Sequence, residues 1–395
     1  MRDVVRLLRL VTALLLVGAV AAVGAPAASA DQARDGQYWL QDLNLPAAWE
    51  ISRGAGVVVG VVDSGANTRH PDLAGALLPG TVINGDPTTD DPVGHGTAVS
   101  VLIAGRGHDG DDGTLGVAPE AMLLPITADG NSNWLREGIR WAVDNGARVI
   151  NVSSGAYIGE AAATGFHDSL AYAESRDVVV VASAGKGDGA GRVSDLASRA
   201  GVVAVSAVDG TATFRPDVSN QGPDVELAAP GVAMPMLAED GDAGFRLATF
   251  TGTSFSAPIV AGTAALIRSE YPELNAASVV QRLVSTATDA GPPGHDPQYG
   301  HGIVNPVAAL TAEVTPVAEN PLGSVTDLMT APAPPVAQGP PESSAGEPVS
   351  LGMVFAVLGG AVVLGGAAVL VVVLLVRRRR RPALVRHPPP AGPWR

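Results

Sequence analysis

The sequence predicts an α/β protein with a doubly wound, mostly parallel sheet, helices on both faces of the sheet, and one C-terminal transmembrane helix. Short runs of β-branched residues alternate with helical segments, which is the pattern of parallel strands joined by helical crossovers. The runs are apolar at successive positions, as in strands that are buried on both faces. A separate apolar stretch at 351–376 carries no charge and is long enough to cross a bilayer.

The first strand is predicted at 57–62, where VVVGVV is followed by a polar turn. Further strands are predicted at 122–126, 148–152, 178–182 and 202–207. Helical spacing predicts helices between or after them, at 98–104, 134–145, 169–175, 257–267 and 274–286. Because ligands of such a sheet bind at the carboxyl ends of its strands, polar residues at those ends are the first candidates for a site.

Charge is distributed unevenly along the chain. The 395 residues carry a net charge of −14, but residues 1–30 contribute +2 and residues 351–395 contribute +7. The remaining residues, 31–350, hold 15 basic and 38 acidic side chains and a net charge of −23. A surface this acidic repels phosphate, so nucleic acid is excluded as a partner, and the charge is expected to keep the domain soluble. The absence of cysteine excludes disulfides and thiolate metal sites.

The N-terminus, 1–30, has the three parts of a signal peptide. Three arginines precede an apolar run at 10–23, and Ala28 and Ala30 form a small-residue cleavage motif. An uncleaved anchor is the alternative, although the apolar run is short for a membrane span. Cleavage after Ala30 leaves a short extension, 31–56, ahead of the main domain.

The C-terminal part is predicted to anchor the protein in the cell membrane. Residues 311–350 are rich in proline, alanine, serine and glycine, which is typical of an extended linker. The apolar stretch 351–376 is followed by the basic tail 377–395, which begins with five arginines. The positive-inside rule keeps this tail in the cytoplasm and places the preceding domain outside, with one pass of the membrane. Nucleic-acid binding by the arginines is the alternative.

Three polar residues occupy the positions where chemistry is expected. Asp63 ends the first strand, His95 stands in GHGT just before a helix, and Ser254 stands in GTSFSAP at the start of another helix. A carboxylate, an imidazole and a hydroxyl supply an orienting group, a general base and a nucleophile. Ser254 alone is equally typical of a helix N-cap. The backbone N–H groups at a helix start can stabilise an oxyanion formed beside such a serine.

The order Asp63, His95, Ser254 with these flanking motifs resembles the subtilisin family of serine proteases. Further motifs agree, among them GVAP at 116–119, INVSSG at 150–155 and SNQGPDVELAAPG at 219–231. The resemblance covers about 37–310 and implies a subtilisin-like peptidase domain at 57–310. It also implies a serine endopeptidase that acts on protein or peptide substrates without a cofactor or a metal.

The order of segments is similar to that of a narrower family, the mycosins, which are membrane-anchored subtilases of type VII secretion. The similarity includes the signal peptide, QYWLQDLNLPAAWEISRGAGVVVGVVDSG at 37–65, YGHGIVNPVAAL at 299–310, the linker, the span and the basic tail. It implies membrane proteins of a secretion machinery as possible partners. Mycosins typically carry cysteines, and this chain has none. The extension 31–56 is too short to fold alone and is expected to wrap the domain.

The resemblance also implies substrate and oxyanion positions. An extended peptide substrate would pair with Ser153, Ser154 and Gly155, and these residues would line the S1 pocket of the enzyme. Subtilisins have an asparagine that donates to the oxyanion at the position of Lys186. Three interpretations stay open: the ammonium donates instead, the site is weakened, or a neighbour supplies the donor.

Several other polar and aromatic residues are predicted to be structural. The acidic loop 108–113 lacks the ligand spacing of a calcium-binding loop, and His70 follows the Asp63 motif in a turn. His295 and His301 stand near the end of the domain without a carboxylate-rich motif. The aromatic residues Tyr38, Trp39 and Trp49 are expected to cover the core, with a partner surface as the alternative.

The sequence therefore favours a membrane-anchored, extracytoplasmic serine endopeptidase. Two other functions remain compatible with it. One is a catalytically weak scaffold subunit that stabilises a secretion complex, and the other is peptide binding without cleavage.

Overall fold

The computed structural model describes residues 33–83, 91, 93–110, 112–128, 132–153, 159–186, 192–240 and 244–325. The predicted signal peptide, transmembrane helix and basic tail lie outside these residues. Among the helices of the described residues, none has the length and apolarity that crossing a membrane requires.

The described residues form a seven-stranded sheet in which every neighbouring pair of strands is parallel. The strand order is β2-β5-β1-β6-β7-β8-β9. The strands are β1 (Val58–Asp63), β2 (Thr81–Val82), β5 (Met122–Thr127), β6 (Val149–Val152), β7 (Val179–Ser183), β8 (Val202–Val208) and β9 (Leu227–Pro230). The order reverses direction between β1 and β6, and the carboxyl ends of strands at such a switch point form the usual ligand crevice.

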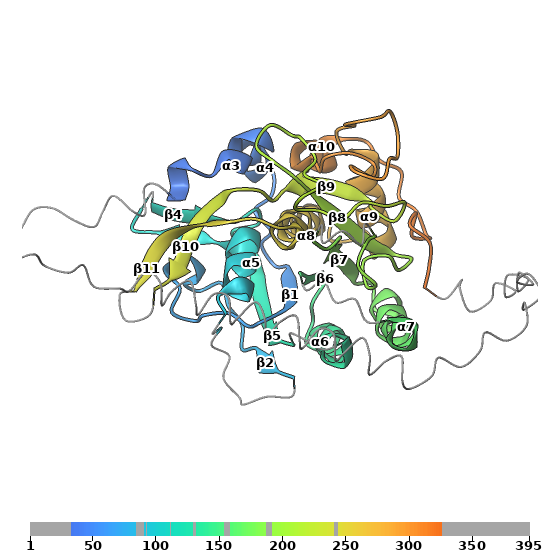
Figure 1. Ribbon diagram of the computed structural model, residues 1–395, viewed down its shortest axis with the longest axis horizontal. Coiled ribbons are helices and arrows are strands. Elements are labelled where there is room, and N and C mark those ends of the chain that lie inside the picture. The colour runs from blue at the N-terminus through green and yellow to red at the C-terminus, as the bar shows by residue number, and fades with distance from the viewer. Residues whose placement is uncertain are drawn as a thin grey trace, which may run out of the picture. The chain divides into compact units, whose positions relative to one another are not determined.

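Helices cover both faces of this sheet (Figure 1). The face with α6 (Ser132–Asp144) and α7 (Gly159–Ser175) buries Val62 and Ile150, while the opposite face buries Val59 and Val61. The second face is covered by α5 (His95–Ala104), α8 (Thr253–Glu270), α9 (Ala276–Ser285) and α10 (Pro306–Thr311). The doubly wound α/β fold is thus confirmed, and every strand and helix predicted within 57–310 is present, although α5, α7 and α8 begin earlier than expected.

Helix α8 lies at the centre of the larger core. It contacts β6, β7, β8 and β9 as well as α5, and all but a few of its residues are buried. A helix enclosed in this way is expected to be apolar on all sides, and most residues of α8 are indeed small or apolar. At Gly262 of α8, an added Cβ would lie 2.6 Å from the Val117 side chain, so glycine is needed where the segment that carries Val117 passes close to the helix.

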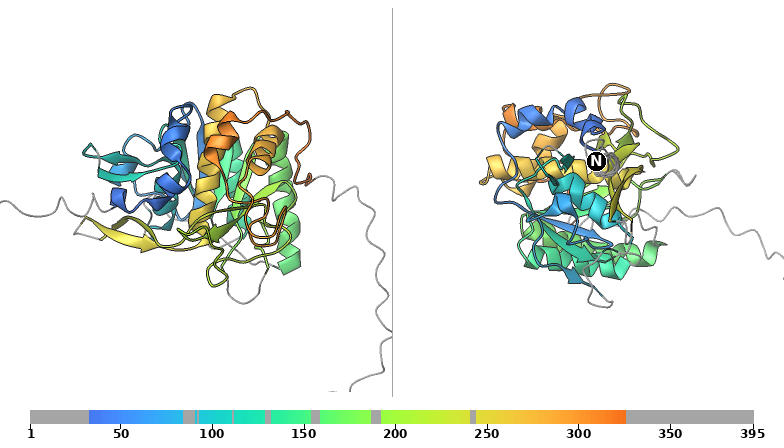
Figure 2. Two further views of the ribbon diagram at one scale, coloured as in Figure 1. Left: turned by 90° about the horizontal axis from the view of Figure 1, so that it is seen from above. Right: turned by 90° about the vertical axis from the view of Figure 1, so that its left-hand side faces the viewer.

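Two antiparallel hairpins were not predicted from the sequence. One joins β3 (Arg106–His108) to β4 (Asp112–Leu115), and the other joins β10 (Met234–Glu239) to β11 (Phe245–Phe250), which extends along one side of the domain (Figure 2). The first replaces much of the expected acidic loop. There the His108 imidazole Nδ1 lies 2.6 Å from Asp72 Oδ1, so the segment is held to the domain by a partly buried hydrogen bond.

The extension before β1 packs against the domain, as expected of a segment too short to fold alone. It contains two short helices, α3 (Tyr38–Asp42) and α4 (Leu45–Trp49). Trp39 is fully buried, and Trp49 Nε1 donates a hydrogen bond of 2.8 Å to the carbonyl of Val117. The prediction that these aromatic side chains cover the core is confirmed.

Contacts with the domain continue beyond the predicted boundary at 310. Residues 311–325 were expected to belong to the linker, but Asn275 Nδ2 donates to the Val317 carbonyl at 2.9 Å and Val325 is buried. The Gly201 N–H also donates to the carbonyl of Leu322 at 3.1 Å. Single anchors of this kind leave no periodic pattern, which is why the sequence did not reveal them.

The first turn of α5 packs directly on the end of β1. Gly96 makes this possible, because a Cβ at this position would lie 2.2 Å from the carbonyl oxygen of Gly65. The Gly96 N–H donates to Ser64 Oγ at 2.9 Å. Helix and strand end are therefore held at a separation that a side chain at 96 would prevent.

The carboxylate of Asp91 fixes the loop before α5. Its Oδ1 accepts from the backbone N–H groups of Val93 at 3.2 Å and Gly94 at 2.8 Å. Its Oδ2 accepts from the N–H and the hydroxyl of Thr97, both at 2.8 Å. Asp91 is only 2% exposed, so if its carboxylate were removed, little water could replace it as the acceptor for these donors.

We predict that Asp91→Ala lowers the free energy of unfolding by about 3 kcal/mol, because it removes hydrogen bonds to a buried charge and leaves their donors unpaired. Chemical denaturation followed by circular dichroism measures this loss. Glu137→Ala removes an exposed carboxylate from α6 and is the matched control, with an expected change below about 0.5 kcal/mol. Equal losses in the two variants would contradict the role assigned to Asp91.

Candidate active site

Asp63 and His95 form a direct hydrogen-bonded pair at the end of β1. His95 Nδ1 lies 2.7 Å from Asp63 Oδ1. The aspartate is 2% exposed, and the same oxygen accepts from the Ser64 N–H at 2.8 Å. Because a carboxylate only accepts hydrogen bonds, this pairing assigns the ring proton to Nδ1 and makes Nε2 the ring nitrogen that carries the lone pair.

Ser254 is the second residue of α8 and is half-buried. Its carbonyl accepts a hydrogen bond of 2.8 Å from Ser153 Oγ, and that hydroxyl accepts one of 2.9 Å from Asn151 Nδ2. Asn151 lies on β6 and is fully buried. The first turn of α8 is thus fastened to the carboxyl end of β6.

The start of α8 lies beside His95. The centroid of the His95 ring is 5.3 Å from that of Phe255, the residue that follows Ser254. Backbone N–H groups at a helix start lack the usual intrahelical carbonyl partner, which makes the Ser254 N–H a candidate donor to an anion, whereas the Phe255 N–H already donates to the Gly252 carbonyl at 3.0 Å. The structure therefore brings together Asp63, His95 and the turn that carries Ser254.

A cavity of about 390 Å³ opens next to Ser254. Residues from several strand ends line it, including Ser153, Gly185, Lys186, Asp217 and Ser254. Two of the predicted site positions, Ser153 and Lys186, thus share one cavity with the candidate nucleophile. The predicted substrate residues Ser154 and Gly155 lie outside the described residues.

The backbone before Lys186 is held on two sides. Gly185 has φ = +98°, which favours glycine, and its N–H donates to Thr253 Oγ1 at 3.2 Å. Its carbonyl accepts from the Asn220 N–H at 3.0 Å. The end of β7 is therefore fixed next to the first turn of α8, and the exposed Lys186 follows at the cavity wall.

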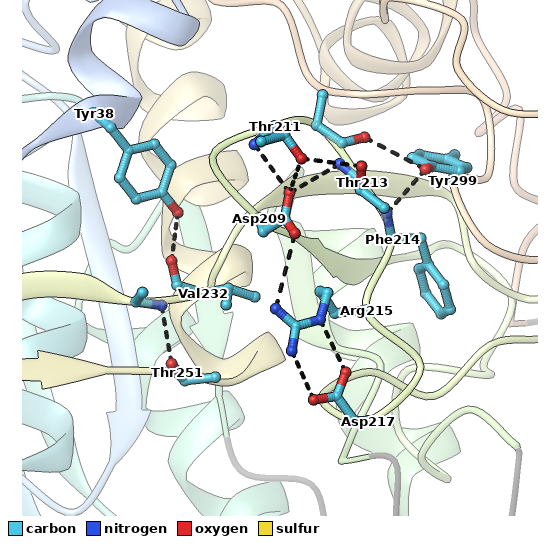
Figure 3. Close-up of polar contacts among 12 residues, drawn as sticks. Tyr38, Asp209, Thr211, Thr213, Phe214, Arg215, Asp217, Val232, Thr251 and Tyr299 are labelled. Carbon is cyan, nitrogen blue, oxygen red and sulfur yellow. Dashed lines mark hydrogen bonds and ion pairs between the residues drawn. The ribbon is translucent and has the colours of Figure 1, made fainter.

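Asp217 contributes a second charged group to the wall of the cavity. Arg215 Nε and Nη2 donate to its two carboxylate oxygens at 3.0 and 2.8 Å, as Figure 3 shows. The hydrogen bond from Arg215 lowers the pKa of Asp217 and keeps its carboxylate ionised at neutral pH. The Asp217 side chain is 62% exposed and that of Arg215 is 36% exposed, so the pair contributes little to stability but places opposite charges near the cavity.

The N-terminal extension reaches the segment that leads into α8 (Figure 3). Tyr38 donates to the carbonyl of Val232 at 2.8 Å, and the next N–H, that of Ala233, donates to Thr251 Oγ1 at 2.9 Å. Burial raises the pKa of Tyr38 to about 12, so its hydroxyl stays protonated and able to donate. The extension thereby supports the chain three residues before Ser254.

Three residues of this arrangement were not predicted from the sequence: Asp91, Asn151 and Asp217. Asp91 and Asp217 stand in polar loops where a single carboxylate has no distinguishing pattern. Asn151 offered the one available signal, because an amide inside the apolar strand 148–152 needs a buried partner. That partner is Ser153.

Among the described residues, no cluster of three potential metal ligands lies at this cavity. One set of three side chains there is close enough to share a metal ion, namely Glu226, His295 and His301. None of the three lines the Ser254 cavity. The polar side chains that line the cavity include the hydroxyls of Ser153 and Ser254, the Lys186 side chain and the Asp217 carboxylate.

Comparison with known proteins gives consistent matches. The subtilase family matches residues 54–302. The chain is 36% identical over 265 residues to subtilisin DY of Bacillus licheniformis, covering 65% of this chain and 92% of that protein. It is also 36% identical over 317 residues to mycosin-4 of Mycobacterium tuberculosis, covering 70% of this chain and 69% of that protein.

Solved structures agree with the sequence matches. The MycP3 protease from the type VII (ESX-3) secretion system is 32% identical with a TM-score of 0.59, covering 70% of this chain and 88% of that one. MycP1 with its N-terminal propeptide removed is 28% identical with a TM-score of 0.61, covering 70% and 98%. The resemblance to subtilisins and mycosins is confirmed. The chain belongs to the subtilase family and is a subtilisin-like serine endopeptidase.

Proposed function

We propose that Asp63, His95 and Ser254 are the catalytic triad of this endopeptidase. The observation that carries the proposal is the 2.7 Å contact between His95 Nδ1 and the buried Asp63 carboxylate, beside the helix start that presents Ser254. The contact leaves His95 Nε2 as the proton acceptor that a serine nucleophile needs.

In the proposed reaction, Ser254 Oγ adds to the carbonyl carbon of the peptide bond while His95 Nε2 takes the hydroxyl proton. The carbonyl oxygen becomes an oxyanion, and the Ser254 N–H donates to it. His95 then protonates the departing amine, which leaves an ester on Ser254. Water adds to this ester with His95 as the base, and the carboxylic acid product leaves as Ser254 regains its proton.

Substrate binding follows from the same edge of the sheet. Ser153 directly follows β6 and lines the cavity, so a peptide lying along 153–155 would pair with the backbone as an added strand. The side chain preceding the cleaved bond would then enter the 390 Å³ cavity. Lys186 and Asp217 are the charged groups that such a side chain would meet.

Lys186 is proposed to limit the rate. A flexible, strongly hydrated ammonium is a less fixed hydrogen-bond donor than an asparagine amide. The hydrogen bond from the Gly185 N–H to the Thr253 hydroxyl supports the proposal, because it holds the residue at 186 beside the first turn of α8. Donation by the Lys186 ammonium and donation by a neighbouring residue are the competing interpretations.

The proposed biological setting is an extracytoplasmic membrane protein associated with type VII secretion. It rests on the predicted signal peptide 1–30, the predicted span 351–376 and the arginines that follow it. The relative MycP3 is described as a protease from such a system. In this arrangement the basic tail 377–395 lies in the cytoplasm, and the partners are membrane proteins of the secretion machinery.

A scaffold role for this subunit is the alternative proposal. It is favoured by one observation, the lysine at the position where subtilisins place an oxyanion-stabilising asparagine. A weakened site would leave an intact fold that could still hold a secretion complex together.

We predict that a fluorophosphonate probe labels the full-length protein in detergent and that Ser254→Ala abolishes labelling. Ser175→Ala, which removes an exposed hydroxyl on α7, is the control and should label normally. The probe reacts only with an activated serine, so gel fluorescence reports the proposed nucleophile directly. The scaffold role would be supported instead if wild type stays unlabelled and secretion survives Ser254→Ala but not deletion of the protein.

We predict that Lys186→Asn raises kcat on peptide substrates by about tenfold or more, because an amide donor to the oxyanion is worth at least that much. Steady-state kinetics at several substrate concentrations separates kcat from KM. Lys186→Ala is the companion variant, and it should not lower kcat if the lysine gives no useful hydrogen bond. An unchanged or lower kcat for Lys186→Asn would show that Lys186 does not limit the rate.

A further inference from the structure

Glu226, His295 and His301 lie together outside the candidate active site. Glu226 immediately precedes β9, while both histidines belong to the loop between α9 and α10. Glu226 Oε2 lies 3.6 Å from His301 Nε2 and 3.8 Å from His295 Nε2. The two imidazole rings meet edge to face, with their centroids 4.8 Å apart.

These separations are suited to a shared metal ion rather than to direct pairing. Both distances are too long for a hydrogen bond between the imidazole and the carboxylate. Zinc bonds of about 2.0–2.1 Å in a tetrahedral arrangement place neighbouring ligand atoms about 3.4 Å apart. The three ligand atoms all lie within 4.8 Å of one another, so small side-chain rotations would bring them to that spacing.

The backbone holds the three side chains in place. An added Cβ at Gly300 would lie 2.3 Å from the carbonyl carbon of Glu226, so glycine allows the loop to touch the strand. The His301 N–H donates to the Glu226 carbonyl at 2.8 Å. Asp296 and Gly300 exchange two backbone hydrogen bonds of 2.9 Å, which close the turn between the histidines. The ligand positions are thus formed before any metal binds.

The surroundings favour a cation with one open coordination position. The Glu226 side chain is 16% exposed, whereas those of His295 and His301 are 34% and 37% exposed. The open side of the cluster leaves room for water to complete the coordination of a bound cation.

We propose that Glu226, His295 and His301 form a zinc site, with Nε2 of each imidazole and one carboxylate oxygen as ligands. Two imidazoles and one carboxylate are a common protein donor set for Zn²⁺. The ion would tie the loop between α9 and α10 to the edge of the sheet at β9. The site is independent of the proposed triad, because none of its residues lines the Ser254 cavity.

Zinc binding by the metal-stripped, full-length protein in detergent tests the proposal. Competition with a chromophoric chelator should give one Zn²⁺ per chain, and the affinity should fall about a hundredfold or more in either His295→Ala or His301→Ala. Zn²⁺ should raise the Tm of wild type but not of these variants, since it binds only the folded site. Co²⁺ should give the visible absorption of a tetrahedral complex.

His167→Ala and His95→Ala are the controls, and both should retain the metal because neither residue belongs to the cluster. Glu226→Gln, which preserves the size of the side chain, should weaken binding in a protein with unchanged circular dichroism. Wild type that binds no Zn²⁺ would overturn the proposal. Binding that is equal in wild type and both cluster histidine variants would overturn it as well.

Discussion

The 2.7 Å contact between His95 and Asp63 depends on how closely α5 approaches the end of β1. The close approach requires glycine at 96, because a Cβ there would lie 2.2 Å from a backbone oxygen of the turn after the strand. It also depends on the buried Asp91 carboxylate, which holds the loop that precedes the helix. The imidazole is therefore positioned by backbone packing, and its own hydrogen bond sets only the final orientation.

Helix α8 imposes the same kind of constraint on Ser254. Its first turn is fastened to the end of β6 through Ser153 and to the end of β7 through the Thr253 hydroxyl. The strands β1, β6 and β7 are consecutive neighbours in the sheet. Because parallel strands end at one edge, three segments distant in sequence contribute to a single crevice. The enclosed body of α8 prevents this first turn from shifting without repacking the core.

Sequence patterns predicted the parts of the fold that carry long apolar runs or unambiguous motifs. The run VVVGVV predicted β1, and the turn residues around Asp63, His95 and Ser254 predicted which strand and helix ends would meet. Patterns could not predict Asp91, because a single carboxylate in a polar loop has no distinguishing pattern. They could not predict the cluster of Glu226 either, because its two histidines lie far away in the sequence. The packing of 311–325 was missed for a related reason, since isolated apolar anchors such as Val325 have no period.

In the proposed mechanism, the buried Asp63 carboxylate selects the reactive tautomer of His95. Asp63→Asn keeps the size of the side chain but lets its amide donate to Nδ1, which moves the ring proton to Nε2 and leaves Nε2 unable to take the Ser254 proton. The decisive measurement is kcat on a peptide substrate for Asp63→Asn and wild type, with stability checked by thermal unfolding. We predict that Asp63→Asn lowers kcat by about 10⁴-fold in a protein that remains folded, as the same Asp-to-Asn change does in the well-known Ser-His-Asp triad. A folded variant that retains more than about a tenth of the wild-type kcat would contradict it.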